Sequence, residues 1–300
     1  MPREKITGAV RAGRTLVSDG AWGTFLTRKG MKAGECPELW NVEHPDDVKE
    51  IGLSYIAAGA EMLKTNSIGG SLYKLQYYGL AERMRELNRS AATISRDAAG
   101  DGNWVLGSMG PTGKLLLMEE VTEEELYESF RNQAMALEVG GADAALIETM
   151  IDVEEACIAI RAVKENTALE VICTFTFEKN GRGEYRTMMG VKPDTAMERA
   201  IEAGVDIVGT NCGNGMERMV EIVREMRAVD AEIPILVHAN AGLPTNIDGK
   251  DVFPDTPELM ARFAIELIGA GANIVGGCCG TTPEHIRAIR TAVDQMKGRG

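Results

Sequence analysis

Four stretches of the sequence share one pattern, in which an amphipathic segment ends at a glycine and a short apolar run follows. They read AAGAEMLKTNS (57–67), VGGADAALIETM (139–150), EAGVDIVGTNC (202–212) and GAGANIVGGCC (269–279). A glycine directly after a helix supplies the left-handed conformation that ends the helix. An apolar run rich in Val, Ile and Leu is typical of a buried strand. The pattern therefore predicts four helix-to-strand joints.

Other apolar runs lie between these joints, and amphipathic segments separate them. The runs are TLVSDG (15–20), WVLGSMG (104–110), VICTFTF (171–177) and PILVHAN (234–240). We expect helices at 45–58, 82–98, 122–139, 153–164, 194–203, 215–228, 256–270 and 283–296. Eight strands alternating with about eight helices predict an α/β fold, a single (β/α)8 TIM barrel, with residues 1–300 as one domain. A doubly wound sheet stays open as the alternative, because the pattern does not show that the sheet closes.

The composition limits the class of protein. The chain has 300 residues, of which 44% are hydrophobic and 26% are charged, and its formal net charge is −13. This acidic balance argues against nucleic acid or an anionic membrane as a partner. The N-terminal sequence lacks the apolar region of a secretory signal, and no apolar run approaches the roughly 20 residues of a membrane helix. Six scattered cysteines do not suggest a disulfide framework, so we expect a cytoplasmic protein.

Polar residues occur at the same level of the predicted barrel, near the C-terminal ends of its strands. The residue seven positions after the glycine of each joint is, in chain order, Asn66, Glu148, Asn211 and Cys278. The other strands end near Asp19, Ser108 and Asn240. Since the active site of a TIM barrel lies at the C-terminal ends of its strands, we expect a site there, with Asn66 as one of its substrate-binding residues.

Three of the six cysteines, Cys212, Cys278 and Cys279, fall at this end of the predicted barrel. Thiolates favour zinc, and three protein ligands with one open position are typical of catalytic zinc. Adjacent residues on a regular strand face opposite sides, so the pair can share a metal only where the strand is distorted. Glycines beside the pair would allow that distortion: Gly276, Gly277 and Gly280. A strained vicinal disulfide stays open as a minor alternative.

Several motifs then match a known family. They are DGAWGT (19–24), AGAEMLKTN (58–66), GPTGK (110–114), ETM (148–150), GTNCGNG (209–215), NAGLP (240–244) and GGCCGTTPEHI (276–286). With them the sequence resembles, from about residue 15 to 295, the zinc-dependent homocysteine S-methyltransferase family. That family includes the homocysteine-binding barrel of cobalamin-dependent methionine synthase and the betaine– and S-methylmethionine–homocysteine methyltransferases.

The resemblance implies a role for each matching residue. Cys212, Cys278 and Cys279 would bind Zn²⁺. Two further matches, Asp19 and Glu148, would hold the amino group of the substrate. The remaining matches are Asn240, a fourth zinc ligand before the substrate enters, and the backbone of Gly20 and Ala21, which would line the amino-acid site.

The function that the resemblance implies is methyl transfer to homocysteine, which forms methionine. Zinc would favour the thiolate, the nucleophilic form of a group whose free pKa lies near 8.5. The methyl donor stays open. No D-x-H-x-x-G segment is present, so any corrinoid would be carried by a separate protein. Two alternatives stay open as well: demethylation of a methylated substrate with transfer to such a corrinoid protein, and a non-enzymatic zinc- or thiol-binding module.

Overall fold

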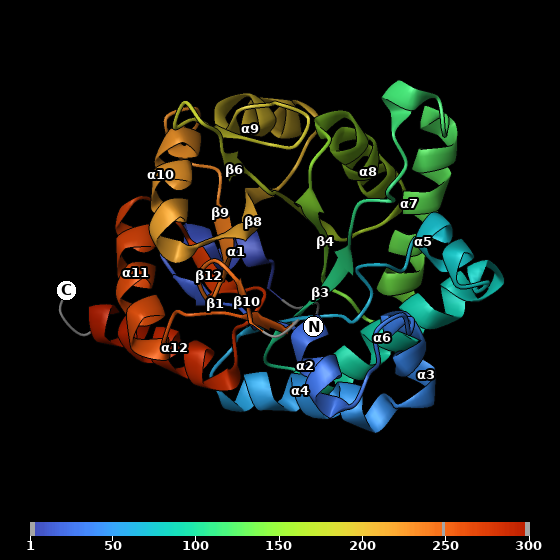
Figure 1. Ribbon diagram of the computed structural model, residues 1–300, viewed down its shortest axis with the longest axis horizontal. Coiled ribbons are helices and arrows are strands. Elements are labelled where there is room, and N and C mark those ends of the chain that lie inside the picture. The colour runs from blue at the N-terminus through green and yellow to red at the C-terminus, as the bar shows by residue number, and fades with distance from the viewer. Residues whose placement is uncertain (1–3, 248–249, 298–300) are drawn as a thin grey trace.

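The computed structural model describes residues 4–247 and 250–297, so the outermost residues of the predicted 1–300 domain lie outside the described ranges. Eight parallel strands form one sheet in the order β1-β12-β9-β8-β5-β4-β3-β2. These strands are β1 (Leu16–Val17), β2 (Met62–Lys64), β3 (Trp104–Met109), β4 (Ala144–Met150), β5 (Glu170–Phe175), β8 (Ile207–Gly215), β9 (Ile235–Asn240) and β12 (Ile274–Gly277). They form the inner ring in Figure 1.

The sheet closes between its first two strands in sequence. Ser18, just after β1, pairs in parallel with Met62 of β2, and the Asp19 N–H donates to the Met62 carbonyl at 3.0 Å. On its other side β1 pairs with β12, where Leu16 lies opposite Ile274. The predicted (β/α)8 barrel is therefore confirmed, and the doubly wound alternative is wrong.

Helices surround the sheet, as Figure 1 shows. The helices that follow the barrel strands are α4 (Pro45–Ala57), α6 (Met84–Ala99), α7 (Glu123–Val139), α8 (Val153–Asn166), α9 (Pro193–Glu202), α10 (Met216–Arg227), α11 (Pro257–Gly269) and α12 (Pro283–Lys297). Each begins and ends within two residues of its predicted range. The joint glycines explain this agreement, because Gly59, Gly141, Gly204 and Gly271 all have positive φ, from 93° to 112°.

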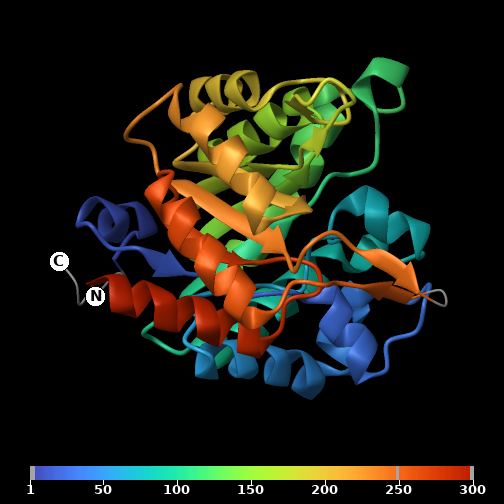
Figure 2. The same cartoon turned by 60° about the vertical axis from the view of Figure 1, so that its left-hand side comes forward.

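Shorter elements decorate the barrel. The short helices are α1 (Ile6–Arg11), α2 (Gly23–Lys29), η1 (Pro37–Leu39), α3 (Trp40–Glu43), α5 (Leu72–Tyr77), η2 (Ala81–Arg83) and η3 (Leu116–Met118). Two antiparallel hairpins pair β6 (Glu178–Lys179) with β7 (Tyr185–Arg186), and β10 (Thr245–Ile247) with β11 (Lys250–Val252). Figure 2 shows α1 and the β10–β11 hairpin at opposite ends of the barrel.

The barrel interior is apolar near the N-terminal ends of the strands. Leu16, Met62, Leu146 and Ile172 belong to one buried cluster there, together with Ile6 of α1. The carboxylate of Glu170, at the start of β5, accepts hydrogen bonds from the Ile6 and Thr7 backbone N–H groups at 2.6 and 3.1 Å. Helix α1 therefore seals the N-terminal end of the barrel, and only the other end is left for a site.

No helix within the described ranges is both long enough and apolar enough to cross a lipid bilayer.

Candidate metal centre

The sulfur atoms of Cys212, Cys278 and Cys279 converge at the C-terminal end of the barrel. All three lie within 4.8 Å of one another. Cys212 Sγ is 3.9 Å from Cys279 Sγ, which is 4.0 Å from Cys278 Sγ. All six cysteines of the chain are free thiols, so the pair is not joined as a vicinal disulfide.

Cys212 reaches the cluster through an unusual backbone. It has a φ of 58°, and Gly213 follows with a φ of 68°. The pairing of β8 with β9 shifts register over this segment, between Asn211 and Gly215. A left-handed conformation is costly for a residue with a Cβ, so neighbouring contacts must hold Cys212 in place.

The side chain of Asn211 makes those contacts. Its Oδ1 accepts hydrogen bonds from the Thr149 N–H and the Thr174 hydroxyl, both at 2.7 Å. Its Nδ2 donates to Thr149 Oγ1 at 2.8 Å. Asn211 is fully buried, so it ties the end of β8 to the ends of β4 and β5 and fixes the direction of Cys212.

The cysteine pair reaches the cluster by a different route from the one predicted. We expected the glycines to distort a continuing strand, but β12 ends at Gly277 and the pair lies in a turn. The Thr281 N–H donates to the Cys278 carbonyl at 3.2 Å, and the Thr281 hydroxyl donates to it at 2.7 Å. Gly280 has a positive φ of 80°. Since a turn lacks the alternation of a strand, both thiols can face one point.

Asn240, at the end of β9, lies against this turn. Its Oδ1 accepts a hydrogen bond from the Cys279 N–H at 3.1 Å. The Cys278 N–H donates to the Ala239 carbonyl at 2.7 Å. The end of β9 therefore holds the backbone of the pair at two points.

The three thiols hold their protons unequally. Hydrogen bonds from Cys278 and Cys279 lower the pKa of Cys212 to about 3. The same contact with Cys212 raises the pKa of Cys278 to about 11 and raises that of Cys279 further. One thiolate is thus favoured, and its charge opposes ionisation of the other two.

The donor set fits a zinc ion. Zinc bonds thiolate sulfur at about 2.3 Å in a tetrahedron, which places two such sulfurs about 3.8 Å apart. The sulfur distances of 3.9 and 4.0 Å are close to that spacing. A divalent cation would also remove the repulsion that keeps Cys278 and Cys279 protonated.

A small hollow of about 240 Å³ opens beside the pair. Cys278, Cys279, Glu148, Ser108 and Lys64 are among the residues that line it. Glu148 is 4% exposed, and the Ser108 hydroxyl donates a short hydrogen bond to its Oε1. Burial raises the pKa of Glu148, while the charge of Lys64 opposes this shift.

Asp19 does not line this hollow, although its Oδ1 is 3.9 Å from the Nζ of Lys64, which does. It is fully buried. Its Oδ2 accepts hydrogen bonds from Trp22 Nε1 at 2.7 Å and from the Lys64 N–H at 2.9 Å. Burial raises the pKa of Asp19, and Lys64 is the strongest opposing influence. In the structure Asp19 therefore serves to join β1 to the start of α2 and to β2.

The segment after Asp19 packs against the cysteine turn. A Cβ on Gly20 would lie 2.6 Å from Thr281 Oγ1 and 2.8 Å from a ring carbon of Tyr55, so the close approach requires glycine. Ala21 lines the hollow. Its N–H donates to Thr281 Oγ1 at 3.0 Å, and its carbonyl accepts from the Tyr55 hydroxyl at 2.7 Å.

Asn66 also lines the hollow. Its Nδ2 donates to the Pro37 carbonyl at 2.7 Å and to Asn41 Oδ1 at 3.1 Å. Its side chain therefore holds the η1–α3 segment over β2. Every residue predicted for the site thus lies at this end of the barrel, but Asp19 and the amide of Asn66 are occupied by contacts within the protein.

Two residues of the site were missed from the sequence. Lys64 enters the hollow from the end of β2, and Thr281 connects Ala21 with Cys278. Lys64 carries a weak signal, since a lysine closes the apolar run MLK two positions before Asn66. Because strand residues alternate, those two positions share a face.

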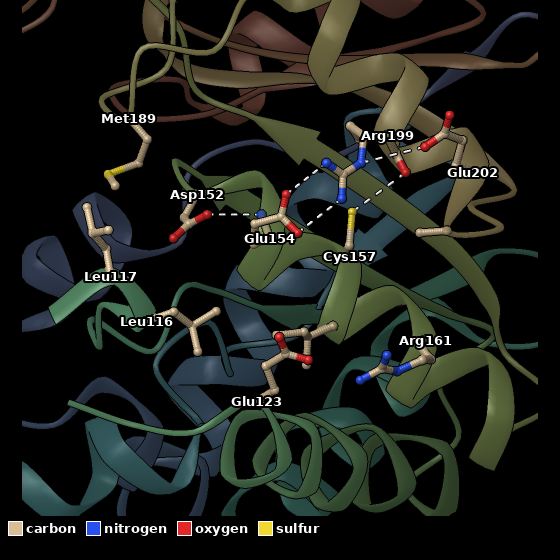
Figure 3. Close-up of a pocket in the computed structure, with 12 residues that line it drawn as sticks. Leu116, Leu117, Glu123, Asp152, Glu154, Cys157, Arg161, Met189, Arg199 and Glu202 are labelled. Atoms are coloured by element: carbon tan, nitrogen blue, oxygen red, sulfur yellow. Dashed lines mark hydrogen bonds and ion pairs between the residues drawn. The ribbon is translucent and has the colours of Figure 1, made fainter. Parts of the chain in front are cut away.

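A wider hollow, about 860 Å³, lies outside the barrel beside α8 and α9 (Figure 3). Some of its charged groups pair with one another, as Arg199 does with Glu154 at 2.9 Å. Cys157 is the cysteine there, and its thiol donates to the Arg199 carbonyl at 3.6 Å. Burial raises the pKa of Cys157, and it is a single thiol among the described residues lining this hollow, in contrast to the cluster at the barrel end.

The chain is similar in sequence to proteins of one known family. A sequence model of the family described as homocysteine S-methyltransferase matches residues 16–293. The methionine synthase of Mycobacterium tuberculosis (strain ATCC 25618 / H37Rv) is 32% identical over 302 residues, which cover 95% of this chain and 25% of that protein. The methionine synthase of Mycobacterium leprae (strain TN) is 32% identical over 300 residues, covering 94% of this chain and 24% of that protein. The chain thus spans about a quarter of the length of these relatives.

A solved structure shows the same fold. The homocysteine methyltransferase MmuM from Escherichia coli, in its metallated form, superposes with a TM-score of 0.76 at 22% sequence identity. The match covers 94% of this chain and 98% of that one. Its apo form gives a TM-score of 0.73 at 23% identity.

Proposed function

The chain belongs to the homocysteine S-methyltransferase family, a family of methyltransferase enzymes, and on that premise we propose that it methylates the thiol of homocysteine to form methionine. Zinc held by Cys212, Cys278 and Cys279 would activate the thiol. The observation that supports this proposal is the position of the sulfur cluster. Two of its three cysteines line the same small hollow as a buried carboxylate, Glu148.

Zinc, when bound, would supply one piece of chemistry: it stabilises the substrate sulfur as a thiolate at neutral pH and leaves it able to attack a methyl group. Three cysteines provide three ligands, so a fourth position is open to the substrate. Asn240 Oδ1 accepts one hydrogen bond from Cys279. A carbonyl oxygen has a second lone pair, which suits Asn240 to the fourth position before the substrate enters.

The protein's own groups would orient the amino acid. Glu148 is the carboxylate among the described residues that line the hollow, and we assign it the substrate ammonium. An arriving ammonium favours the charged form of Glu148, against the burial that raises its pKa. Asp19 would act indirectly, since it holds Trp22 and the backbone of Lys64. The backbone of Gly20 and Ala21 would form the wall beside the cysteine turn.

The methyl donor would approach from a second hollow of about 750 Å³. Cys279 and Thr24 line both hollows, and Arg28, Asp251 and Phe253 are among the residues that line only the second. A donor seated there would face the cysteine cluster from outside the amino-acid pocket. The hollow suits a small donor such as S-methylmethionine or glycine betaine, and it opens the cluster to a separate methylated corrinoid protein.

The test is a donor screen with homocysteine as the acceptor. Methylcobalamin, S-methylmethionine and glycine betaine would each be supplied to the zinc-loaded protein, with and without a chelator, and methionine would be measured. We expect methionine from at least one donor and its loss on chelation. No methionine from any donor contradicts the proposal and favours transfer to or from a corrinoid partner, or a non-enzymatic thiol-binding role.

A cysteine variant tests the metal centre separately. Cys279→Ala removes one of three ligands, so we expect zinc content after dialysis to fall below about a tenth of the wild-type value, because three-thiolate sites depend on every ligand. Cys157→Ala is the matched control, since Cys157 lies beside Arg199 on the outer surface. Full zinc content in Cys279→Ala would show that the three cysteines do not form the zinc site.

A further inference from the structure

Lys64 brings a positive charge into the pocket beside the cysteines. It is the last residue of β2 and is 5% exposed. Among the described residues that line the pocket, Lys64 provides the cationic side chain and Glu148 provides the carboxylate. Thiol activation and ammonium binding do not require a lysine, so its presence needs another explanation.

The Lys64 ammonium has more donors than the protein uses. It carries three N–H donors. Within the described residues one acceptor lies at hydrogen-bond distance, the Gly277 carbonyl at 3.3 Å. Asp19 Oδ1 is 3.9 Å away, which is an ion pair without a hydrogen bond. Donors of Lys64 therefore remain for a ligand in the pocket.

Asp19 does not depend on the Lys64 ammonium for its hydrogen bonds. Its Oδ2 accepts from Trp22 Nε1 and from the Lys64 backbone N–H, and its Oδ1 accepts from the Ser18 hydroxyl at 3.3 Å. The ammonium adds a charge to a carboxylate that is already held. Neutralising Asp19 is therefore an incomplete account of Lys64.

Other donors near the pocket are partly committed. The Ala21 N–H, which would otherwise face a substrate, donates to Thr281 Oγ1 at 3.0 Å. The Ser108 hydroxyl donates to Glu148. A substrate carboxylate in this pocket thus finds in Lys64 a charged donor with spare capacity.

We propose that Lys64 binds the α-carboxylate of the substrate and so adds a second charged contact to the one assigned above to Glu148. The proposal deepens the proposed function and rests on it, because it takes the substrate sulfur to lie at the cysteine cluster. A pocket of about 240 Å³ has room for a small amino acid. A thiol that lacks either charged group would leave one buried charge without its partner, which is costly.

Lys64 stays charged in this setting. Burial acts to lower its pKa, but Asp19, Glu148 and the cysteine pair outweigh burial and raise the pKa above the ordinary lysine value. A fixed cation is suited to a carboxylate, since charge-assisted hydrogen bonds are stronger than neutral ones.

The test compares three thiols that differ only in their charged groups. Homocysteine has both groups, 3-aminopropane-1-thiol lacks the carboxylate, and 4-sulfanylbutanoate lacks the ammonium. Calorimetry would measure the binding of each thiol to the zinc-loaded wild type and to Lys64→Met. We expect Lys64→Met to weaken the binding of homocysteine and of 4-sulfanylbutanoate about 30-fold, which is the effect of losing one charge-assisted hydrogen bond. Binding of 3-aminopropane-1-thiol should change less than about threefold.

Matched variants separate this role from a structural one. Glu148→Gln should give the reciprocal pattern: it should weaken the binding of homocysteine and 3-aminopropane-1-thiol and leave the binding of 4-sulfanylbutanoate unchanged. Asp19→Asn/Lys64→Met removes both members of the buried ion pair, so it avoids an unpaired carboxylate should Lys64→Met fold poorly, and it should show the same selective loss. Lys49→Met, at an exposed ion pair with Asp97 on the outer surface, should bind all three thiols as the wild type does.

The outcomes distinguish the two proposals. Equal weakening of homocysteine and 3-aminopropane-1-thiol by Lys64→Met, or by the double variant, would overturn carboxylate binding by Lys64 and leave the methyltransferase proposal standing. Failure of the wild type to bind any of the three thiols would overturn both proposals.

Discussion

Cys212 shows at the level of one residue how the fold directs a side chain into the sulfur cluster. Its left-handed backbone costs roughly 1–2 kcal/mol for a residue with a Cβ. Asn211 offsets that cost through three hydrogen bonds to Thr149 and Thr174. The position of the Cys212 sulfur therefore depends on the side chain of its neighbour, Asn211.

Asn211→Ala should accordingly weaken both the fold and the metal site. Loss of three buried hydrogen bonds predicts a fall in the free energy of unfolding of about 2–4 kcal/mol, measured by chemical denaturation. Zinc affinity, measured by chelator competition, should fall as well, because Cys212 is no longer held. Asn211→Asp keeps the Oδ1 acceptor, so its stability and its zinc affinity should lie between those of the wild type and those of Asn211→Ala. Wild-type stability and zinc affinity in Asn211→Ala would refute this account.

Counting along the sequence located much of the site, and its limits are physical. Seven residues after a joint glycine is a fixed distance along a strand, so the count placed Glu148 and Cys278 at one height. Lys64 was missed because a lysine that closes an apolar run is most often solvated. The hydrogen bonds that occupy Asp19 come from Trp22 and β2. Such tertiary contacts leave no mark in local sequence.

At the level of elements, β12 is the strand whose end determines the site. The sequence indicated correctly that two adjacent cysteines need an irregular backbone. It did not indicate that the strand would end at Gly277. The turn packs closely against the strand end, where a Cβ at Gly277 would lie 2.3 Å from Thr281 Oγ1, so this position requires glycine. This packing of the turn against the strand end could not be seen before the fold was known.

Strand β8 offers a test of packing between elements. A Cβ on Gly209 would lie 1.8 Å from the Leu236 carbonyl oxygen of β9, and backbone cannot move aside as a flexible side chain can. We expect Gly209→Ala to lower the free energy of unfolding by more than about 3 kcal/mol. Gly181→Ala is the control, since nothing lies within 4 Å of a Cβ there, and it should change stability by less than about 0.5 kcal/mol. Similar unfolding midpoints for the two variants would contradict the close approach of β8 and β9.

At the level of the whole molecule, the alternation of helices and strands was predictable because each joint is marked by glycine. The closure of the sheet into a barrel was not predictable, since the Ser18–Met62 pairing joins residues 44 positions apart. The family was predictable from short motifs that meet only in three dimensions. The GPTGK motif has a different role: the Thr112 N–H donates to Glu155 of α8 at 2.8 Å, which anchors the loop after β3 to an outer helix.

The proposed zinc ion should stabilise the whole barrel, because the three cysteines that would bind it come from two distant parts of the chain. Free zinc at 100 times its dissociation constant predicts a gain of about 2.7 kcal/mol. That corresponds to a rise in the melting temperature of roughly 4 °C in a thermal scan. Cys279→Ala should show no such rise. The same rise in that variant would mean that zinc stabilises the protein from another site.

The pairing of β1 with β12 also has a consequence for biosynthesis. Leu16 finds its partner, Ile274, only after more than 250 further residues have been made. The Glu170 carboxylate that fixes α1 likewise emerges long after α1 itself. Contacts so distant in sequence form slowly. The barrel of the nascent chain therefore stays open, and the cluster of Cys212 stays incomplete, until residues 274–279 have been made. During that interval an oxidant or a competing metal can reach the thiols, so the newly made protein depends on the reducing capacity of its surroundings until the ring is closed.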